Sequence, residues 1–477
     1  MIDDPKPYVD SAIMKPMICT CSGNIPWILE LPEHWKTVRA KGLFSPRTER
    51  ARIDDDQLSA TQSYGVIPQK DFERLVGRRV VQITQHLDKR AHVEPNDFII
   101  SMRSFQGGLE RAWARGCIRS SYVVLKPSRQ AHIGYFAHLF KSQDYIRALQ
   151  VTGNFIRDGQ DLNFNNFSLV DLPLPPLDEQ AAIVRYLNHS TRQVDLAIHK
   201  KRSFIKLLTE QKQALIHQTV TLGLNLSISF KSSGISWLGN IPQHWEIRKL
   251  KFEMAFRGGG TPSKDNLSYW NGSIPWVSPK DMKLDIIEDT EDHITIRAVS
   301  ESSTSLVPAG SLLMVVRSGI LQRTIPIARC ARELALNQDM KALTSRGRLD
   351  LDYFAFFIRG HEKSLLQEWT KTGATVESVE HQYLANTKVP IPPLSEQIEI
   401  VEFLDNKTAP LSAAISQIER ELDLLRQYRT RLISDIVTGK LDVRTAAASL
   451  PADADETVPV AVDADGDDLD ADEEGEA

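Results

Sequence analysis

The chain has 477 residues, of which 42% are hydrophobic and 25% are charged, and its formal net charge is -5. This length suffices for about three or four domains with their own cores, and no apolar run approaches the ~18 to 20 residues that span a bilayer. The first residues, MIDDPKPYVD, lack the basic and then apolar pattern of a signal peptide, so we expect a cytoplasmic protein with no membrane partner.

The negative charge comes from one end of the chain. Residues 451–477 hold twelve acidic residues and no basic one, and without them 57 basic residues face 50 acidic ones, a net charge of +7. An acidic, alanine-rich segment with little to bury is predicted to be disordered. The remaining chain is mildly basic, which permits a nucleic-acid partner without requiring one.

The four cysteines indicate no metal site. Cys19 and Cys21 form a single C-x-C, and Cys117 and Cys330 stand alone. These spacings match neither a disulfide framework nor a zinc site. We therefore expect no metal ion bound to this chain.

Two stretches of the chain are nearly the same. LPLPPLDEQAAIVRYL begins at Leu172 and VPIPPLSEQIEIVEFL begins 217 residues later at Val389, with nine of sixteen positions identical. A second marker, P-x-H-W, occurs in LPEHW from Leu31 and in IPQHW from Ile241. A period of about 210 residues is far longer than a solenoid repeat, so whole domains are duplicated.

The histidines of the P-x-H-W marker are candidates for packing rather than for chemistry. His34 and His244 stand beside Trp35 and Trp245, and no cluster of Cys, His or Asp accompanies them. We expect each imidazole to be hydrogen-bonded within a turn that positions the neighbouring tryptophan.

The repeats divide the chain into alternating parts. The segments between the markers mix short β-rich runs with one or two helices, which predicts α/β domains whose helices cover a curved sheet. Helix signals follow each Pro-Pro-Leu. In chain order we expect an N-terminal extension (1–23), a first domain (24–172), a central helical region (173–230), a second domain (231–389), a C-terminal helical region (390–446) and a disordered acidic tail (447–477).

A short helix with a break after it is expected behind each Pro-Pro-Leu. The breaks fall at NHSTRQ and DNKTAP, where Thr191 and Thr408 are plausible N-caps. Pro410 then suits a first helical turn, where a missing N–H costs little.

Apolar residues at heptad spacing follow each break, and they include Leu208 and Leu215 in the first copy and Leu425 and Leu432 in the second. These a and d positions predict a coiled-coil seam between two helices of roughly 30 residues, each about 45 Å long. Lys212 and Arg429 occupy equivalent a positions, a type of interruption that can fix register.

The connections favour an antiparallel pair. The first helix is expected to end near Leu222 and the second to begin near Thr408, with only one domain between them, so a parallel partner would start a full helix length away. The two domains would then lie at opposite ends of a spacer, related by a pseudo-twofold axis. Alternatively, each apolar stripe packs on its own domain.

The chain lacks recognisable catalytic motifs. There is no G-x-x-x-x-G-K-[ST], and RGGGTPS at Arg257 is not a G-x-G-x-x-G that opens a helix. Neither Asn nor Asp precedes a Pro-Pro-aromatic, the motif with which amino-methyltransferases hold a flipped base. We therefore expect a chain that is not an enzyme.

Polar loops offer donors for phosphates and base edges instead. Arginine suits guanine, asparagine and glutamine suit adenine, and glycines permit close backbone approach. In the first domain the candidates for DNA binding are Gln62, Tyr64, Lys70, Arg103, Gln106, Arg111 and Arg115. In the second domain they are Arg257, Thr261, Ser263, Lys264, Lys280, Arg317, Gln322, Arg323, Asn337 and Gln338. Alternatively, these are solvated loop residues and caps.

The repeated P-x-P-P-L-x-E-Q-x-x-I-V-x-x-L with its long helix, together with IPQHWEIRKLK, GGTPS...YWNGSIPWVSPKDM and ALNQDM, resembles the specificity subunits of type I restriction-modification enzymes over about residues 24–446. The resemblance implies two target recognition domains that alternate with helical regions paired as an antiparallel coiled coil. The N-terminal extension, the weaker match in the first domain and the acidic tail depart from the family pattern.

The family resemblance also implies partners. The helical regions would recruit modification subunits, expected to be two, which carry an adenine methyltransferase, and motor-nuclease subunits, which use ATP. S-adenosylmethionine, ATP and Mg would then be bound by those partners and not by this chain. The candidate residues of the subunit interface are Glu179, Gln180, Leu208, Leu215, Glu396, Gln397, Leu425 and Leu432.

Family and sequence together predict a double-stranded DNA target in two half-sites with a non-specific gap. Domains held about 45 Å apart would read half-sites roughly one helical turn, ~34 to 36 Å, apart. Helix length would set the gap, so a heptad inserted in either helix is expected to lengthen it. Two other hypotheses remain open: a bivalent scaffold that binds only proteins, and a single-chain methyltransferase or nuclease.

Overall fold

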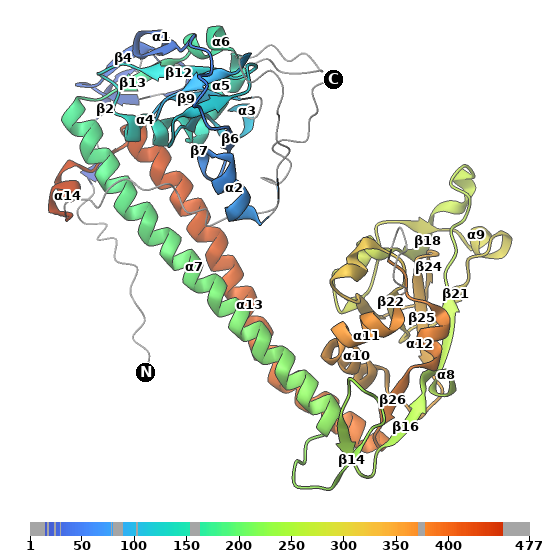
Figure 1. Ribbon diagram of the computed structural model, residues 1–477. Coiled ribbons are helices and arrows are strands. Elements are labelled where there is room, and N and C mark those ends of the chain that lie inside the picture. Colours follow the sequence, from blue (N-terminus) through green and yellow to red (C-terminus); the bar gives the residue numbers. More distant parts are fainter. Residues whose placement is uncertain are drawn as a thin grey trace. The chain divides into compact units, whose positions relative to one another are not determined.

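The computed structural model describes residues 15–16, 19–22, 25–28, 30–77, 79, 89–101, 104–152, 163–370 and 377–451. The chain forms two compact units, residues 1–202 with 419–477 and residues 203–418. Each unit holds one α/β domain and part of each of two long helices, α7 (Leu177–Leu222) and α13 (Leu394–Val437) (Figure 1). The predicted disordered tail (447–477) is wrong at its start, because residues 447–449 belong to helix α14 (Arg444–Ser449) and Ala447 is buried; residues from 452 onward lie outside the described residues. None of the described helices combines the length and apolarity needed to cross a membrane.

The first domain is built around a four-stranded antiparallel sheet with strand order β10-β9-β12-β5. Phe44 of β5 packs edge to face on Phe136 of α4, with ring centroids 5.2 Å apart. Phe98 of β9 packs in the same way on Phe140, at 5.1 Å. Helix α4 therefore covers this sheet through aromatic pairs, whose edge-to-face geometry is the favoured one. 

The strands described in the first unit are β1 (Lys15–Pro16), β2 (Cys19–Ser22), β3 (Glu30–Pro32), β4 (Lys36–Arg39), β5 (Phe44–Pro46), β6 (Leu58–Thr61), β7 (Gly65–Pro68), β8 (Ala91–Val93), β9 (Phe98–Ile100), β10 (Glu110–Arg111), β11 (Gly116–Ile118), β12 (Val123–Pro127), β13 (Asp171–Leu174) and β27 (Leu441–Asp442). Its shorter helices are α1 (Ala40–Leu43), α2 (Gln69–Val76), α3 (Ser104–Gly107), α4 (Ile133–Phe140), α5 (Gln143–Val151), α6 (Phe164–Ser168) and α14 (Arg444–Ser449).

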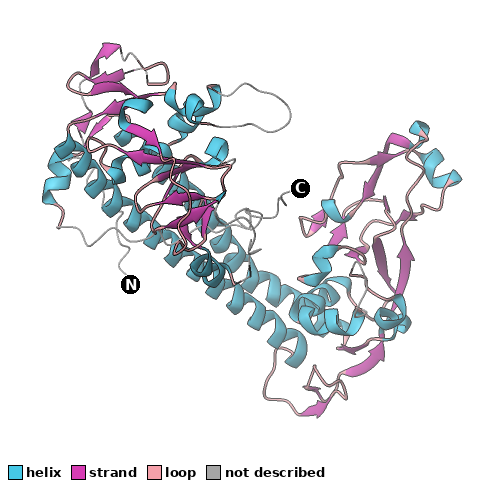
Figure 2. Cartoon of the chain, turned by 45° about the horizontal axis from the view of Figure 1, so that its top comes forward, coloured by secondary structure: helices cyan, strands magenta, loops and turns pink. Residues whose placement is uncertain are grey.

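The second domain contains a five-stranded sheet, ordered β17-β25-β22-β23-β19, and a four-stranded sheet, ordered β20-β18-β24-β21. Figure 2 shows the strands of both domains in magenta and the helices in cyan. Tyr353 and Phe354 of α10 and Trp369 of α11 are fully buried in its core. Short strands and a few helices form as the sequence predicts; for example, LLMV forms β22 and LDYFAFFIRG forms α10. A further β-rich run, RRVVQIT (78–84), lies largely outside the described residues.

The strands of the second unit are β14 (Phe230–Ser232), β15 (Asn240–Pro242), β16 (Glu246–Lys249), β17 (Met254–Gly258), β18 (Trp270–Val277), β19 (Ile286–Ile287), β20 (His293–Ile294), β21 (Leu306–Val307), β22 (Leu312–Val315), β23 (Ile327–Cys330), β24 (Leu334–Leu336), β25 (Met340–Ser345) and β26 (Lys388–Ile391). Its shorter helices are α8 (Leu250–Glu253), α9 (Ile296–Glu301), α10 (Leu351–Gly360), α11 (Glu362–Trp369) and α12 (His381–Asn386), with 3-10 turns η2 (Leu267–Tyr269), η3 (Pro279–Asp281) and η4 (Gly319–Gln322).

The N-terminal extension takes part in the first domain. Its strand β2 pairs with β3, as β14 pairs with β15 in the second domain. Its strand β1 pairs with β27, which follows the end of α13. Residues 15–16 and 19–22 therefore belong structurally with the first unit.

The long helices are uninterrupted, so the predicted breaks are wrong. Helices α7 and α13 have 46 and 44 residues, about 69 and 66 Å at 1.5 Å per residue. Thr191 does not cap a helix, because its hydroxyl donates to Leu187 O, four residues earlier, at 2.7 Å. Pro410 lies inside α13 rather than in a first turn. Tertiary packing of a continuous apolar face outweighs these local stop signals.

The two helices pair in antiparallel fashion, as expected. Lys201 of α7 forms an ion pair with Glu421 of α13 at 2.5 Å. Further along α7, Lys212 donates to Ser412 Oγ at 2.8 Å. From Lys201 to Lys212 the residue numbers rise along α7, while those of their partners in α13 fall from Glu421 to Ser412, so the two helices are antiparallel.

The predicted interruptions of the seam have equivalent partners. Lys212 meets Ser412, and Arg429 forms an ion pair with Asp195 at 3.2 Å. Both the two basic residues and their two partners are 217 positions apart, which is the period of the Pro-Pro-Leu repeat. Burial lowers the pKa of Lys212. Polar contacts at these a positions specify one register.

The ends of the apolar stripes pack on domains. Leu432 and Ile436 of α13 join the core of the first domain, and Ile216 and Val220 of α7 join the core of the second. Each helix thus begins beside one domain and ends in the core of the other. The alternative in which each stripe packs on its own domain is wrong.

One junction occurs in each unit and accounts for both sequence markers. His34 Nε2 donates to Glu179 Oε2 at 2.7 Å, and His244 Nε2 donates to Glu396 Oε2 at 2.7 Å. The histidine of P-x-H-W is therefore bonded to the glutamate of P-P-L-x-E-Q, which confirms its packing role. 

The neighbouring tryptophans contact the glycines that end the helices. Trp245 lies against Gly223 and Trp35 against Gly439, both in the left-handed region (φ +73° and +80°), and a Cβ on either glycine would lie 3.2 Å from the ring. Such glycines are typical helix ends. In each unit the marker residues therefore connect the start of one long helix, the end of the other long helix and the domain beside them.

Candidate nucleic-acid interface

Three loops of the second domain meet at one edge of the five-stranded sheet. Strands β17 and β22 both pair antiparallel with β25, so Gly258 at the end of β17 and Val315 at the end of β22 flank Met340 at the start of β25. The loops 259–264, 316–323 and 337–339 therefore lie together, although about 80 residues of sequence separate the first from the last.

The three loops are fixed to one another. A Cβ at Gly259 would lie 2.0 Å from Asn337 O, so only glycine permits this approach. The Thr261 hydroxyl donates to Gln338 Oε1. Val316 N donates to Asp339 O at 2.8 Å. The loops form one defined surface, which we call the loop edge of the second domain.

The loop edge carries exposed donors. The side chains of Lys264, Arg317, Gln322 and Arg323 are exposed and, within the described part of the chain, make no hydrogen bond or ion pair. Ser263 beside them is also exposed. Two arginines and a lysine on a surface without acidic partners can bind phosphates or guanine edges. These five predicted residues are brought together by the fold.

Other predicted residues of this domain have structural partners. Asn337 is 6% exposed, and its Oδ1 accepts from Asp339 N at 3.0 Å, so it shapes a turn and is not available for base contacts. Lys280 is held between Glu291 at 3.0 Å and Asp292 at 2.9 Å, and these carboxylates raise its pKa. The predicted DNA contacts of Asn337 and Lys280 are therefore not supported by their surroundings.

Arg257 and Gln338 are exposed but already hydrogen-bonded to the protein. Arg257 is exposed on β17, but its guanidinium donates to Leu306 O of β21. Gln338 is exposed and bonded to Thr261. A base edge would have to replace these bonds, so the two side chains are positioned by the loops they tie together.

In the first domain, Gln62 and Gln106 come together. Gln62 is exposed in the turn between β6 and β7, and a Cβ at Gly107 would lie 2.5 Å from its Cδ. Gln106 is exposed next to that glycine on α3, and Lys70 is exposed on α2. Three of the seven predicted residues of this domain are thus accessible amides or cations. 

The remaining residues of the first domain are less accessible. Tyr64 is 7% exposed and packs on Phe72, at 6.3 Å between ring centroids, so it belongs to a small apolar cluster rather than to a contact surface. Arg111 donates to Asn96 Oδ1 at 2.7 Å and lies over the Trp113 ring. Both side chains thus already contact their own domain, and a DNA contact of either residue stays a prediction.

Arg115 pairs with Asp54 at 2.8 Å and Asp55 at 3.3 Å. The neighbouring Asp54 carboxylate raises the pKa of Arg115. This side chain is 40% exposed and already neutralised, so a phosphate would compete with two carboxylates. Arg103 lies outside the described residues.

Two lysines were missed by the sequence analysis. Lys141 binds Glu110 and donates to Gln62 O at 3.3 Å, which fixes the Gln62 turn. Lys341 lies within β25 opposite Gly258, and burial lowers its pKa. For Lys341 the available signal was a single charged residue within the strand MKALTS.

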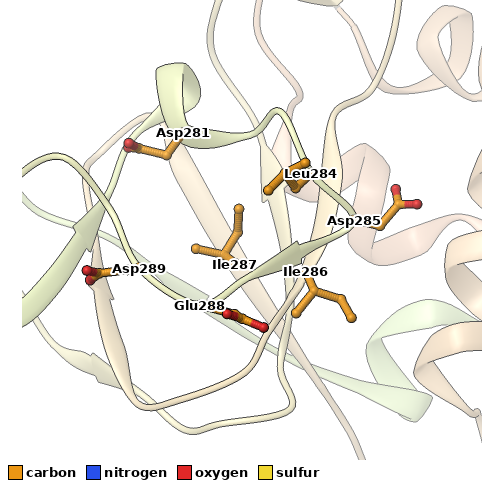
Figure 3. Close-up of a pocket in the computed structure, with 7 residues that line it drawn as sticks. All are labelled: Asp281, Leu284, Asp285, Ile286, Ile287, Glu288 and Asp289. Atoms are coloured by element: carbon orange, nitrogen blue, oxygen red, sulfur yellow. The ribbon is translucent and has the colours of Figure 1, made fainter. Parts of the chain in front are cut away.

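A shallow hollow of about 490 Å³ lies on the second domain and is not suited to DNA. Figure 3 shows its lining, in which Asp281, Asp285, Glu288 and Asp289 surround apolar side chains of β19 and its neighbours. Asp285 and Asp289 are paired with Arg359 and His293, respectively. An acidic lining repels phosphates, and the described residues contain no cluster able to hold a metal ion.

The residues predicted for a subunit interface are mostly internal. Gln180 and Gln397 are 1% and 0% exposed, Glu179 is buried and Glu396 is half-buried at the junctions. Leu208 and Leu432 are buried, and Leu215 and Leu425 are half-buried in the seam and the domain cores. Exposed apolar residues of the long helices, which sequence reasoning missed because they fall outside the heptad seam, include Leu196, Phe204, Leu207, Leu424 and Tyr428.

Comparisons with known proteins agree with this architecture. Residues 242–424 match the type I restriction modification DNA specificity domain. The chain is 37% identical over 214 residues to the EcoR124I/EcoR124II specificity subunit of Escherichia coli, covering 43% of this chain and 50% of that protein. It is 22% identical over 385 residues to the EcoKI specificity subunit of Escherichia coli K12, covering 77% and 80%.

A solved chain has the same fold. It comes from work on complex assembly and conformational transition of the type I R-M system, and it matches with a TM-score of 0.61 and 19% identity over 86% of this chain and 99% of its own length. The region that matches the type I restriction modification DNA specificity domain comprises most of the second domain and most of α13. The resemblance of the chain to type I specificity subunits is confirmed, although it spans only about half the length of the first curated relatives it matches.

Proposed function

We propose that this chain is the DNA-recognition subunit of a type I restriction-modification enzyme. The observation that carries the proposal is the contrast within a duplicated structure: both units repeat the same junction, while the loops that carry exposed donors differ. Arg317, Gln322 and Arg323 mark the loop edge of the second domain, whereas Gln62, Gln106 and Lys70 are the accessible donors of the first. Two different half-sites require different recognition loops, and equivalent supports can carry both sets.

The target is then a bipartite double-stranded DNA sequence with a non-specific spacer. We assign one half-site to the first domain (24–172) and the other to the second (231–389), with helical regions 173–230 and 390–446 as the spacer element between them. The match of residues 242–424 to a DNA specificity domain supports this assignment.

Chemistry is assigned to partner subunits. Two modification subunits would carry S-adenosylmethionine and methylate adenine, and motor-nuclease subunits would use ATP and Mg, in the cytoplasm. Exposed apolar side chains that such partners would cover occur on both long helices, among them Leu196, Phe204 and Leu207 on α7 and Leu424 and Tyr428 on α13. In this proposal the chain itself is not an enzyme.

The test is single-molecule sequencing for N6-methyladenine in DNA from cells that express the chain with its cognate modification subunit. The expected result is a gapped motif with unlike halves that is absent from cells without the chain. A modification subunit that methylates with another specificity subunit but gives no motif with this one would contradict the proposal.

The exposed apolar side chains on the helices also suit a bivalent scaffold that binds proteins and no DNA. Salt dependence separates the two functions, because a DNA reader releases counterions and loses affinity steeply as ionic strength rises. A scaffold would form its protein complex without any affinity for duplex DNA.

A further inference from the structure

The glutamine of each P-P-L-x-E-Q stretch has the same three hydrogen bonds in both units. Gln397 Nε2 donates to Pro392 O at 2.8 Å and to Arg348 O at 2.9 Å, and its Oε1 accepts from Asp350 N at 2.7 Å. The side chain is 0% exposed. The amide nitrogen of Gln397 therefore donates two hydrogen bonds within the protein, and its amide oxygen accepts one.

The first unit repeats this arrangement. Gln180 Nε2 donates to Pro175 O at 2.8 Å and to Gln130 O at 3.3 Å, and its Oε1 accepts from His132 N at 2.9 Å. It is 1% exposed. Two glutamines 217 positions apart thus hold equivalent backbone atoms in domains whose loops differ, so the arrangement belongs to the duplicated support and not to either loop set.

Each glutamine joins a long helix to a domain helix at its N-terminus. Asp350 and His132 are the N-cap residues of α10 and α4, and a glutamine reaching a cap N–H normally comes from the same helix. Here it comes from the first turn of α13 or α7. The bond therefore fixes the direction of the domain helix relative to the long helix.

A second contact holds the same domain helix to the other long helix. Tyr353 OH of α10 donates to Val220 O of α7 at 3.4 Å, and Tyr135 OH of α4 donates to Val437 O of α13 at 2.9 Å. The tyrosine hydroxyl thus attaches the domain helix to one long helix, and the glutamine attaches the N-cap residue of the domain helix to the other. Two separate attachment points prevent rotation of the domain about either one.

Accepting the proposed function, we infer that Gln180 and Gln397 are positioning residues that set the orientation of each recognition domain on the helix pair, and thereby restrict the DNA spacer to one length. They touch no base in this proposal. Their loss is expected to change which spacer is accepted and to leave both half-sites unchanged.

The replacement Gln397→Met keeps the length of the side chain and removes all three hydrogen bonds, and Gln180→Met does the same in the first domain. Gln397→Glu keeps the acceptor for Asp350 N and loses both donations, so it serves as a second, milder variant. Gln218→Met, at an exposed position near the end of α7, is the matched control.

The first readout is the spacer distribution of N6-methyladenine motifs in cells expressing each variant with the modification subunit. In both Met variants we expect about a tenfold rise in the share of methylated sites whose spacer is one base pair too long or too short. This corresponds to losing roughly the net free energy of one hydrogen bond from the preference for the correct spacer. A variant that is merely less stable lowers methylation at all sites alike. An unchanged single spacer in both Met variants overturns the inference.

The second readout does not depend on DNA. Spin labels at Lys363→Cys on α11 and Asn406→Cys on α13, in a full chain whose native cysteines are replaced, report the distance from domain to helix within the second unit. The distance distribution is expected to broaden in Gln397→Met and to stay narrow in Gln218→Met. An equally narrow distribution in Gln397→Met overturns the inference. If the wild-type chain yields no motif, the proposed function fails and this distance alone decides the role of Gln397.

Discussion

The side chains with polar character divide into those that are available and those that the fold has already engaged. The Arg317 side chain is exposed at the loop edge and makes no hydrogen bond or ion pair among the described residues, whereas Asn337, two strands later in the sequence, is buried in a turn that it shapes. Both lie in motifs with the right residue types for base recognition. Availability, and not residue type, separates the candidates.

Arg317→Ala is expected to weaken binding of the methylated motif by about 1 to 3 kcal/mol and to relax one base position if Arg317 reads guanine. The measurement is a binding titration of the complex with the modification subunit on duplexes that vary one position at a time. Arg332→Ala is the matched control, because Arg332 is exposed in the turn after β23, at the other edge of the same sheet. Equal weakening on all sequences would assign Arg317 to a phosphate, and no change would assign it to solvent.

His361 predicts a pH dependence of stability. Burial, with the adjacent His217 imidazole as a smaller cause, lowers the pKa of His361 to about 3, while its Nε2 lies 3.1 Å from Thr221 Oγ1. The unfolded chain, with an imidazole pKa of about 6.5, then binds more protons than the folded chain between pH 3 and 6.5. The contribution of this group to stability is full above pH 6.5 and is lost as the pH falls below it.

Urea unfolding of the second unit in the wild type and in His361→Gln measures this effect. Between pH 6.5 and pH 5 the wild type is expected to lose roughly 2 kcal/mol more than the variant, at about 1.4 kcal/mol per pH unit. Glutamine retains a partner for Thr221 and removes the titrating group. Parallel pH profiles for the two proteins would show that His361 does not titrate in this window.

At the scale of elements, each domain is attached to both long helices. Helix α7 starts at the junction of the first domain and ends at Val220 against Tyr353 of the second, and α13 runs the opposite way. A heptad inserted into one helix alone would therefore separate a helix end from its domain. The expectation that either helix can be lengthened by itself is replaced by the requirement that both be lengthened together.

One heptad inserted in both helices, after Arg202 and after Ile418, is expected to lengthen the spacer of the methylated motif by about three base pairs, since seven residues add about 10.5 Å and one base pair about 3.4 Å. Both half-sites are expected to stay the same. Motif sequencing measures the two quantities at once. Altered half-sites with a constant spacer would refute the role of helix length.

At the scale of the whole molecule, charge favours a polyanion partner once the tail is set apart. Residues 1–450 carry a net charge of +7, and the loop edge of the second domain adds exposed arginines without acidic partners among the described residues. Neutralising six to ten phosphates would cost roughly 10³ to 10⁵ in affinity between 50 and 200 mM salt. 

That salt dependence is the prediction for the complex of this chain with its modification subunit on a duplex carrying the motif. The slope is expected to be nearly the same on a scrambled duplex, because phosphates contribute in both cases, while the affinity differs. Measuring binding by fluorescence anisotropy at several salt concentrations tests it. Affinity that does not change with salt would favour the scaffold.

The sequence by itself determined the duplication, the α/β character of both domains, the antiparallel direction of the helices and the family resemblance. These follow from patterns within short windows: repeated motifs, heptads and strand periodicity. It failed at NHSTRQ and DNKTAP, because local stop signals are weaker than a continuous packed face. Only the tertiary structure decided that Glu179 and Glu396 bind the marker histidines, that Gln180 and Gln397 hold domain helices, and that Asn337, Tyr64 and Arg111 are engaged internally. Such assignments depend on partners far away in the chain, and a polar side chain looks the same in sequence whether its hydrogen bonds are made to the protein or left for a ligand.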